Sequence, residues 1–321
     1  MTRPLPIALT FDLDPDVFDE SISPTEARTK ISWRGVHEGI PMIRESLAAL
    51  AHERGVEPRP SWFVRVDNQI EAIWGRPGYL LEAYAGLFEE VCSAGEEIAL
   101  HPHLYRRQGA GWVQETDPSA LYEKLDEALA DMRALGYAPR TVRIGEAYGA
   151  NALMEAFDRL GLAYDSTAMA GRRRVDGERL IDWEPTPHRA FHPSCADHRI
   201  PGEPARRVVE LPMSMLRVQA DYDAQPFLRY LDLSFHPHAL QPGLEALVAE
   251  ADYIVTVTHP SAFLSDLAPR EHGLVSFDIT ALEANFKALL DAAERCGRPV
   301  TFTTISALGD ACAAALKAVD A

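Results

Sequence analysis

The chain has 321 residues and a formal net charge of −17, with 48 acidic residues against 31 Lys and Arg. This acidity argues against binding to nucleic acid or to anionic membrane surfaces, because both require basic faces. The four cysteines form no C-x-x-C pair, and no signal peptide or membrane-spanning stretch is evident. We therefore expect a cytoplasmic protein that acts on a dissolved small molecule. A homo-oligomer is possible.

Short apolar strands alternate with longer amphipathic helices along the chain. Strands are predicted at residues 5–9, 61–66, 97–100, 141–143, 162–165, 208–211, 253–258 and 300–303. Helices are predicted at residues 39–54, 77–94, 118–135, 151–160, 241–250, 280–295 and at the C-terminal end, with Asn151 as a cap. Two segments, 15–34 and 170–207, lack periodicity, and we interpret the second as a substrate loop.

This repeated order predicts parallel strands covered by helices. No G-x-G-x-x-G motif follows the first strand, so a dinucleotide-binding fold lacks its fingerprint. We therefore predict an α/β fold, specifically a single-domain distorted (β/α) barrel. In such barrels the functional side chains gather at the C-terminal ends of the strands.

Two aspartates, Asp12 and Asp14, stand where the first strand should end. Side chains two residues apart on a strand point the same way, so the two carboxylates could share one pocket. Such a pair needs a metal ion or a raised pKa to offset the repulsion. One Asp could thus bind a metal while the other acts as a base. The alternative is an Asx-turn or a helix cap.

Two histidines, His101 and His103, follow the third strand as His-Pro-His. Neutral imidazoles suit borderline divalent metals, and two of them with one carboxylate leave positions open for water and substrate. The alternative is a pair of ordinary loop histidines. The tripeptide recurs at His236 and His238, before a predicted helix, where we expect a surface or substrate-loop position.

Other polar residues also stand at predicted strand ends. Arg143 could pair with Asp12 and hold it ionised. Asp165 could face the site or cap a helix. His259 follows a run of β-branched residues and should face the same end of the barrel as Asp14.

Aromatic and basic residues could contact a substrate. Trp62, Tyr148 and Trp183 could form apolar walls for a sugar ring, although Trp62 could equally belong to the core. Arg172, Arg173 and Arg174 form a basic cluster within the predicted substrate loop. The cluster could hold an anionic group of a substrate or simply be a solvated part of the loop.

An ordered set of motifs resembles the polysaccharide deacetylase (NodB-homology) family, over roughly residues 9–260. The motifs are Thr-Phe-Asp-x-Asp, Gly-Glu-Glu-Ile-Ala-Leu-His, Arg-x-Gly, Leu-Gly-Leu-x-Tyr-Asp-Ser, Glu-Leu-Pro and Thr-His-Pro. The resemblance implies a distorted (β/α) barrel with one divalent metal, usually zinc. It implies Asp12 as general base, Asp14 and His101 as metal ligands, Arg143 as the residue that orients Asp12, and His259 as general acid.

The chain departs from the family at the second histidine, which usually stands four residues after the first and is Tyr105 here. Either His103 takes that role through a different turn, or the site binds metal weakly or not at all. We expect substrate contacts from Tyr105, Tyr148, Asp165 and Trp183.

The function expected from these residues is hydrolysis of an N-acetyl or N-formyl amide on an amino sugar. One alternative is a metal-independent amidohydrolase, similar to allantoinase, that opens a cyclic ureide or imide. The other is a non-catalytic barrel that binds a sugar or a partner.

Overall fold

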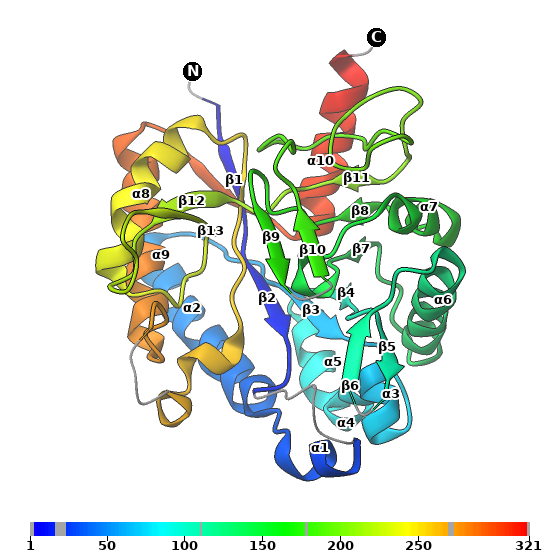
Figure 1. Cartoon of the computed structure of the whole chain (residues 1–321). Helices are drawn as coiled ribbons and strands as arrows, with labels where there is room; N and C mark the ends of the chain where they lie inside the picture. The colour runs from blue at the N-terminus through cyan, green and yellow to red at the C-terminus, as the bar shows by residue number, and fades with distance from the viewer. Residues whose placement is uncertain (1–2, 17–23, 110, 177–178, 269–272, 320–321) are drawn as a thin grey trace.

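The computed structural model describes residues 3–16, 24–109, 111–176, 179–268 and 273–319. Within this part of the chain, parallel strands form two sheets (Figure 1). The larger sheet has the order β11-β8-β7-β4-β3-β2. Its strands are β2 (Thr10–Leu13), β3 (Ser61–Arg65), β4 (Glu97–His101), β7 (Thr141–Val142), β8 (Tyr164–Asp165) and β11 (Val209–Glu210). The smaller sheet places β1 (Leu5–Ala8) between β14 (Ile254–Val255) and β15 (Val300–Phe302).

The N-terminal segment belongs to both sheets. Strands β1 and β2 are separated only by Leu9, whose carbonyl accepts a hydrogen bond of 2.9 Å from the Ser61 amide. A parallel bridge also joins Phe11 to Thr258, beyond the end of β14. Among the described residues, however, no strand pairing connects β11 to β14. The predicted α/β class and parallel strands are thus confirmed, while a closed barrel is not formed by these strands.

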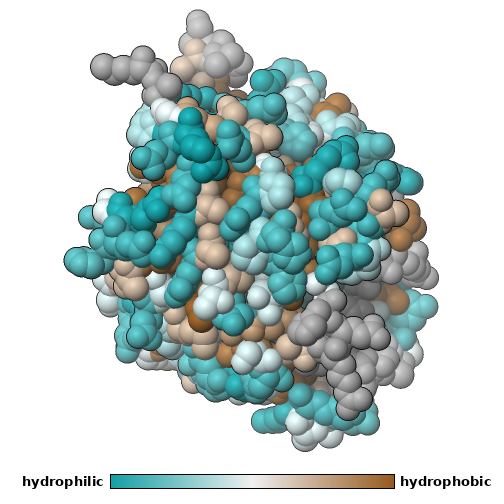
Figure 2. Space-filling view, turned by 90° about the vertical axis from the view of Figure 1, so that its left-hand side faces the viewer, coloured by the Kyte–Doolittle hydropathy of each residue, from teal (hydrophilic) through white to brown (hydrophobic). Residues whose placement is uncertain are grey.

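Helices cover the sheets on both sides (Figure 1). One group contains α2 (Ile40–Arg54), α8 (Pro237–Glu250) and α9 (Ile279–Arg295), in which α9 packs against both others. Figure 2 shows that hydrophilic side chains cover most of the face on this side. The opposite side carries α6 (Pro118–Ala134) and α7 (Asn151–Leu160), which pack together. None of the described helices is long and apolar enough to cross a membrane.

Several short elements were not predicted. They are helix α1 (Pro24–Lys30), helix α3 (Asn68–Trp74) and the hairpins β5–β6 (Tyr105–Gln108 and Gly111–Gln114), β9–β10 (Arg173–Asp176 and Arg179–Asp182) and β12–β13 (Met215–Val218 and Phe227–Tyr230). Two of them, α1 and β9–β10, lie in the segments predicted to be loops. Elements of four to seven residues are too short for a helical or alternating period to emerge above the surrounding sequence.

Some predicted helices differ in their ends. The helix predicted at 77–94 is two helices, α4 (Tyr79–Ala83) and α5 (Ala85–Ser93), and α8 begins several residues earlier than predicted. The N-cap of α7 is Ala150, so the prediction of Asn151 as a cap is wrong. The Asn151 side chain instead donates to the Ala196 carbonyl at 2.8 Å and accepts from the His198 amide at 2.7 Å. It therefore ties α7 to the 170–207 segment.

The C-terminal helix α10 (Ile305–Val319) joins the two sheets. Ile305 and Leu308 belong to a buried cluster with residues of β1, β3, β4, β8, β11 and β14. Gly309 lies in the same part of the helix, where an added Cβ would approach the Tyr164 ring to 2.5 Å. The absence of a side chain at Gly309 thus lets α10 pack directly on β8.

We expect Gly309→Ala to destabilise the fold by roughly 1–3 kcal/mol, because the new methyl group must displace Tyr164. This expected loss of stability is opposite to the effect of helix propensity, which favours Ala over Gly by about 1 kcal/mol. Gly86→Ala in α5 is the matched control, because nothing lies within 4 Å of its added Cβ. Urea unfolding should show Gly86→Ala more stable than the wild type and Gly309→Ala less stable. Equal shifts in the two variants would contradict the packing argument.

Candidate active site

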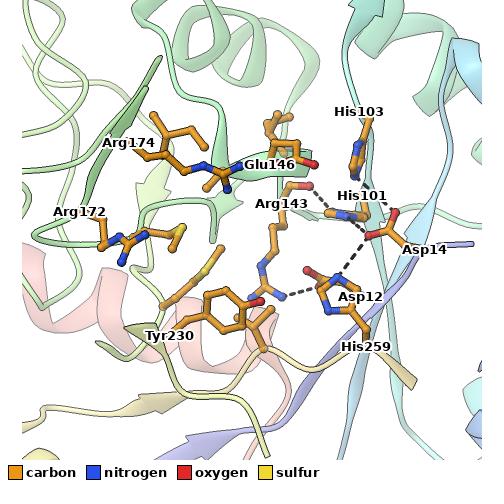
Figure 3. Close-up of a pocket in the computed structure, with 16 residues that line it drawn as sticks. Asp12, Asp14, His101, His103, Arg143, Glu146, Arg172, Arg174, Tyr230 and His259 are labelled. Atoms are coloured by element: carbon orange, nitrogen blue, oxygen red, sulfur yellow. Dashed lines mark hydrogen bonds and ion pairs between the residues drawn. The ribbon is translucent and has the colours of Figure 1, made fainter. Parts of the chain in front are cut away.

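A cavity of about 250 Å³ lies at the C-terminal ends of the strands (Figure 3). The six residues expected to bind metal or catalyse line it together, namely Asp12, Asp14, His101, His103, Arg143 and His259. The parallel order explains this convergence, because the carboxyl ends of parallel strands share one edge of a sheet.

Three of these side chains form a possible metal site. The ligand atoms of Asp14, His101 and His103 all lie within 4.8 Å of one another. Nε2 of His101 is 3.5 Å from Oδ2 of Asp14, and Nε2 of His103 is 3.4 Å from Oδ1. The carboxylate thus faces both imidazoles, as a common ligand set requires.

Each imidazole presents one nitrogen to the Asp14 carboxylate. Nδ1 of His101 lies 2.8 Å from the Arg143 carbonyl, which can only accept, so this nitrogen carries a proton and Nε2 is the one that faces the metal position. Burial lowers the pKa of His101, but Asp12 and Asp14 outweigh burial and raise it, so a metal at Nε2 would displace a proton. Nε2 of His103 is buried and has no hydrogen-bond partner. Burial and the nearby Arg65 lower the pKa of His103, which keeps it neutral. These donors fit a borderline divalent cation such as zinc.

Gly145 explains how His103 reaches Asp14. A Cβ at Gly145 would lie 1.9 Å from Cδ2 of His103, so the imidazole occupies the space that any other residue would fill. Two backbone hydrogen bonds fix this turn: the Gly145 amide donates to Pro102 at 2.9 Å, and the His103 amide donates to Oδ2 of Asp67 at 2.9 Å. His103 therefore lies against Asp14, and Tyr105, two residues later, does not line the cavity.

Arg65, which no prediction from the sequence named, also contacts Asp14. It ends β3, is 2% exposed, and places Nη1 2.7 Å from Oδ1 of Asp14. Its other guanidinium nitrogens bond to Asp67 and Gln69. Arg65 thus fixes the orientation of the Asp14 carboxylate. The signal in the sequence is an Arg-x-Asp that directly follows the apolar run from Trp62 to Val64.

The Asp14 carboxylate is held in its ionised form. Burial alone would raise its pKa, but His103 and His101 hold the pKa of Asp14 well below its usual range. An ionised carboxylate is the form that ligates a cation.

The expected ion pair between Arg143 and Asp12 is present, with Nη1 2.6 Å from Oδ1. Arg143 is fully engaged: Nη1 also donates to Oγ1 of Thr10 at 2.8 Å, and Nε donates to the Ser166 carbonyl at 2.9 Å. The guanidinium lies 4.0 Å from the centroid of the Phe63 ring. Arg143 thus fixes one oxygen of Asp12, and Asp12 lines the cavity.

His259 lies on the open side of the site, with its side chain 36% exposed and Nε2 3.3 Å from Oδ2 of Asp14. Burial lowers its pKa, but the carboxylates of Asp14 and Asp12 outweigh burial and raise the pKa of His259 to about 9. The two carboxylates thus favour the protonated imidazole, which is the form that can donate a proton.

Four residues expected to contact substrate do not line the cavity: Tyr105, Tyr148, Asp165 and Trp183. Trp183 is fully buried and its Nε1–H donates to the Ala147 carbonyl at 2.8 Å. Tyr105 is also buried, beside the ring of His103, and Tyr148 is half-buried against the core. Aromatic side chains in these positions support the walls of the site from behind.

The remaining candidates lie away from the cavity. Trp62 belongs to the core, where it stacks on Phe11 with ring centroids 4.7 Å apart. The second His-Pro-His stands at the start of α8, where the His238 side chain is 67% exposed. That copy is therefore on the surface.

Asp165 forms a buried carboxyl pair with Glu210 on the adjacent strand. Apart from this mutual contact, Oδ2 of Asp165 and Oε2 of Glu210 have no hydrogen-bond partner. Burial raises the pKa of Asp165 to about 6, and burial and Asp165 raise the pKa of Glu210 well above its usual range. Two adjacent carboxyls cannot both ionise at low cost, so the pair shares a proton.

Comparisons with known proteins agree with this architecture. The chain matches no family model and no curated protein. Among solved structures, it is similar to a candidate polysaccharide deacetylase from Mycobacterium smegmatis, with a TM-score of 0.53 and 16% identity over 97% of this chain and 91% of that chain. The two proteins share a fold.

Two further structures show weaker similarity. A 4-α-glucanotransferase from Thermococcus litoralis has a TM-score of 0.48 and 10% identity over 95% of this chain and 40% of that chain. A family 4 carbohydrate esterase from Streptomyces lividans has a TM-score of 0.39 and 12% identity over 93% and 92% of the respective chains. Neither similarity carries an argument about this chain, so its chemistry must be argued from the site.

We expect Gly145→Ala to lower zinc affinity by about 10- to 100-fold, because the added methyl group displaces His103 from Asp14. Isothermal titration calorimetry of the metal-free protein measures this directly. His103→Ala should lower affinity on its own but add little in the Gly145→Ala background, since the imidazole is already displaced. Fully additive losses in the double variant would contradict this role for Gly145.

The carboxyl pair predicts a pH-dependent stability. Both groups bind protons more tightly in the folded chain, so their contribution is complete below their ordinary pKa values of 3.8 and 4.5 and is lost as pH rises through about 6 and beyond. Glu210→Gln removes one titration, so its stability relative to wild type should rise with pH, by on the order of 1 kcal/mol at mildly alkaline pH. Urea unfolding across this range, with the exposed Glu184→Gln as control, measures the difference. A constant difference at all pH values would contradict the shared proton.

Proposed function

We propose that the protein is a metal-dependent hydrolase that removes an acetyl or formyl group from the nitrogen of an amino sugar. One observation carries the proposal: Asp14, His101 and His103 face one another in the cavity that Asp12 and His259 also line. This arrangement combines a ligand set, a carboxylate that could accept a proton and an imidazole that could donate one around a single cavity.

The chain's own residues supply the proton transfers. A divalent metal bound by Asp14, His101 and His103 would polarise the amide carbonyl and lower the pKa of water. Asp12, oriented by Arg143, would accept the proton of the attacking water as the new C–O bond forms. His259 would donate its proton to the amide nitrogen as the C–N bond breaks. The products are the free amine and acetate or formate.

Other features support a small substrate. The cavity of about 250 Å³ is smaller than the roughly 300–1,000 Å³ typical of drug-sized ligands.

We infer that the two sheets act as one distorted barrel, because segment 5–13 belongs to both. The shared fold with a candidate polysaccharide deacetylase supports this interpretation.

The metal-independent alternative finds less support. In a site without metal, the buried Nε2 of His103 would face Oδ1 of Asp14 at 3.4 Å, a separation longer than an ordinary hydrogen bond. A bound metal would give this nitrogen a stronger partner. The metal-dependent reaction therefore accounts for more of the observed geometry.

The test is release of acetate or formate from N-acetylated and N-formylated amino sugars, with metal-free and zinc-restored protein. Activity should depend on the metal. Asp12→Asn and His259→Ala should each lower kcat by at least about 10²-fold, because each removes a proton-transfer group. His238→Ala, from the exposed second His-Pro-His, is the matched control and should behave as wild type. Full activity after chelation, or in the Asp12→Asn variant, would contradict the mechanism.

A further inference from the structure

Two arginines lie on the wall of the cavity opposite the metal site. Arg172 and Arg174 line it, and Figure 3 shows both across the cavity from Asp14 and the histidines, with Glu146 beside Arg174. Side chains alternate along β9, so Arg173 and Arg174 point to opposite sides. Both are exposed, but Arg173 does not line the cavity. Two of the three clustered arginines therefore face the cavity.

The guanidinium of Arg172 has few polar partners. Its Nε is buried and has no hydrogen-bond partner, while Nη1 donates to the Leu228 carbonyl. The guanidinium lies 4.1 Å from the centroid of the Phe227 ring. Within the described part of the chain, no ion pair joins Arg172 to a carboxylate. The positive charge is thus positioned by a carbonyl and a ring, neither of which neutralises it.

Further positive charge lies near Arg172. Burial and the neighbouring Arg229 and Arg174 lower the pKa of Arg172. Arg229 is neutralised by Asp223, with Nη1 2.8 Å from Oδ2. Arg172 itself has no carboxylate partner among the described residues, and burying an uncompensated charge is costly, so a bound anion would remove that cost. Guanidinium groups are well suited to carboxylate and phosphate oxygens.

We propose that Arg172 and Arg174 bind an anionic group of the substrate, so that the enzyme selects a small N-acyl compound carrying a carboxylate or phosphate over a neutral one. The proposal rests on the proposed function for the acyl end of the substrate. The anion would lie on the basic wall while the acyl group faces Asp14, Asp12 and His259. Binding at both ends would orient the amide, which is how remote binding energy assists a reaction.

Binding can be tested separately from catalysis. Isothermal titration calorimetry would compare glucose 6-phosphate, glucuronate and glucose, none of which carries an acyl amide. We expect wild type to bind one of the two anionic sugars at least about tenfold more tightly than glucose. Arg172→Gln and Arg174→Gln should each lose this preference, whereas Arg173→Gln, with the same charge change, should keep it. Which anionic sugar binds more tightly distinguishes phosphate from carboxylate.

Catalysis gives the second readout. In wild type, kcat/KM for N-acetylglucosamine 6-phosphate or for the N-acetylglucosamine uronate should exceed that for neutral N-acetylglucosamine by more than about tenfold. In Arg172→Gln this ratio should fall, because KM for the anionic substrate rises. Equal binding of glucose and both anionic sugars, or equal losses in Arg173→Gln and Arg172→Gln, would overturn the proposal. Anion-selective binding without any amide hydrolysis would instead contradict the proposed function and leave the anion site standing. Hydrolysis with no anion preference would contradict the anion site alone.

Discussion

The site depends on the Asp14 carboxylate, which four side chains contact through its two oxygens. Oδ1 faces Arg65 and His103, and Oδ2 faces His101 and His259. These residues come from three segments of the chain, which lie at or beyond the ends of β3, β4 and β14, and their contacts require that these strands end at the same edge. The carboxylate is therefore the centre of the candidate metal site. Its contacts form only when these strands are correctly arranged.

The strand order explains how these residues meet. Residues 5–13 form one nearly continuous strand that pairs with β3 on one side and β14 on the other. Asp14 follows directly, and His101 at the end of β4 and His259, four residues beyond β14, both reach it. Arg65 stands opposite His101 in the register of β3 and β4. Arg65 pairs with Asp14 and with Asp67, and Arg143 pairs with Asp12, so each carboxylate at this edge has a guanidinium partner.

Much of this edge could be predicted from the sequence, because an apolar run shows where a strand ends. Asp12, Asp14, His101 and His259 all directly follow such runs. Arg65 also directly follows an apolar run, but its contact with Asp14 depends on a partner from another segment. The space at Gly145 exists only in three dimensions. Trp183 was expected at the substrate because aromatic residues suit sugars, yet the same size and apolarity suit the core, where it is buried.

The most direct measurement is a crystal structure of the protein soaked with zinc, with anomalous diffraction recorded at the zinc edge. The geometry requires one strong anomalous peak within coordination distance of Asp14, His101 and His103 together, at about 2.0–2.2 Å from each donor. Well-diffracting crystals with no peak at this position, or with zinc bound only elsewhere, would contradict the assignment of these three residues as a metal site.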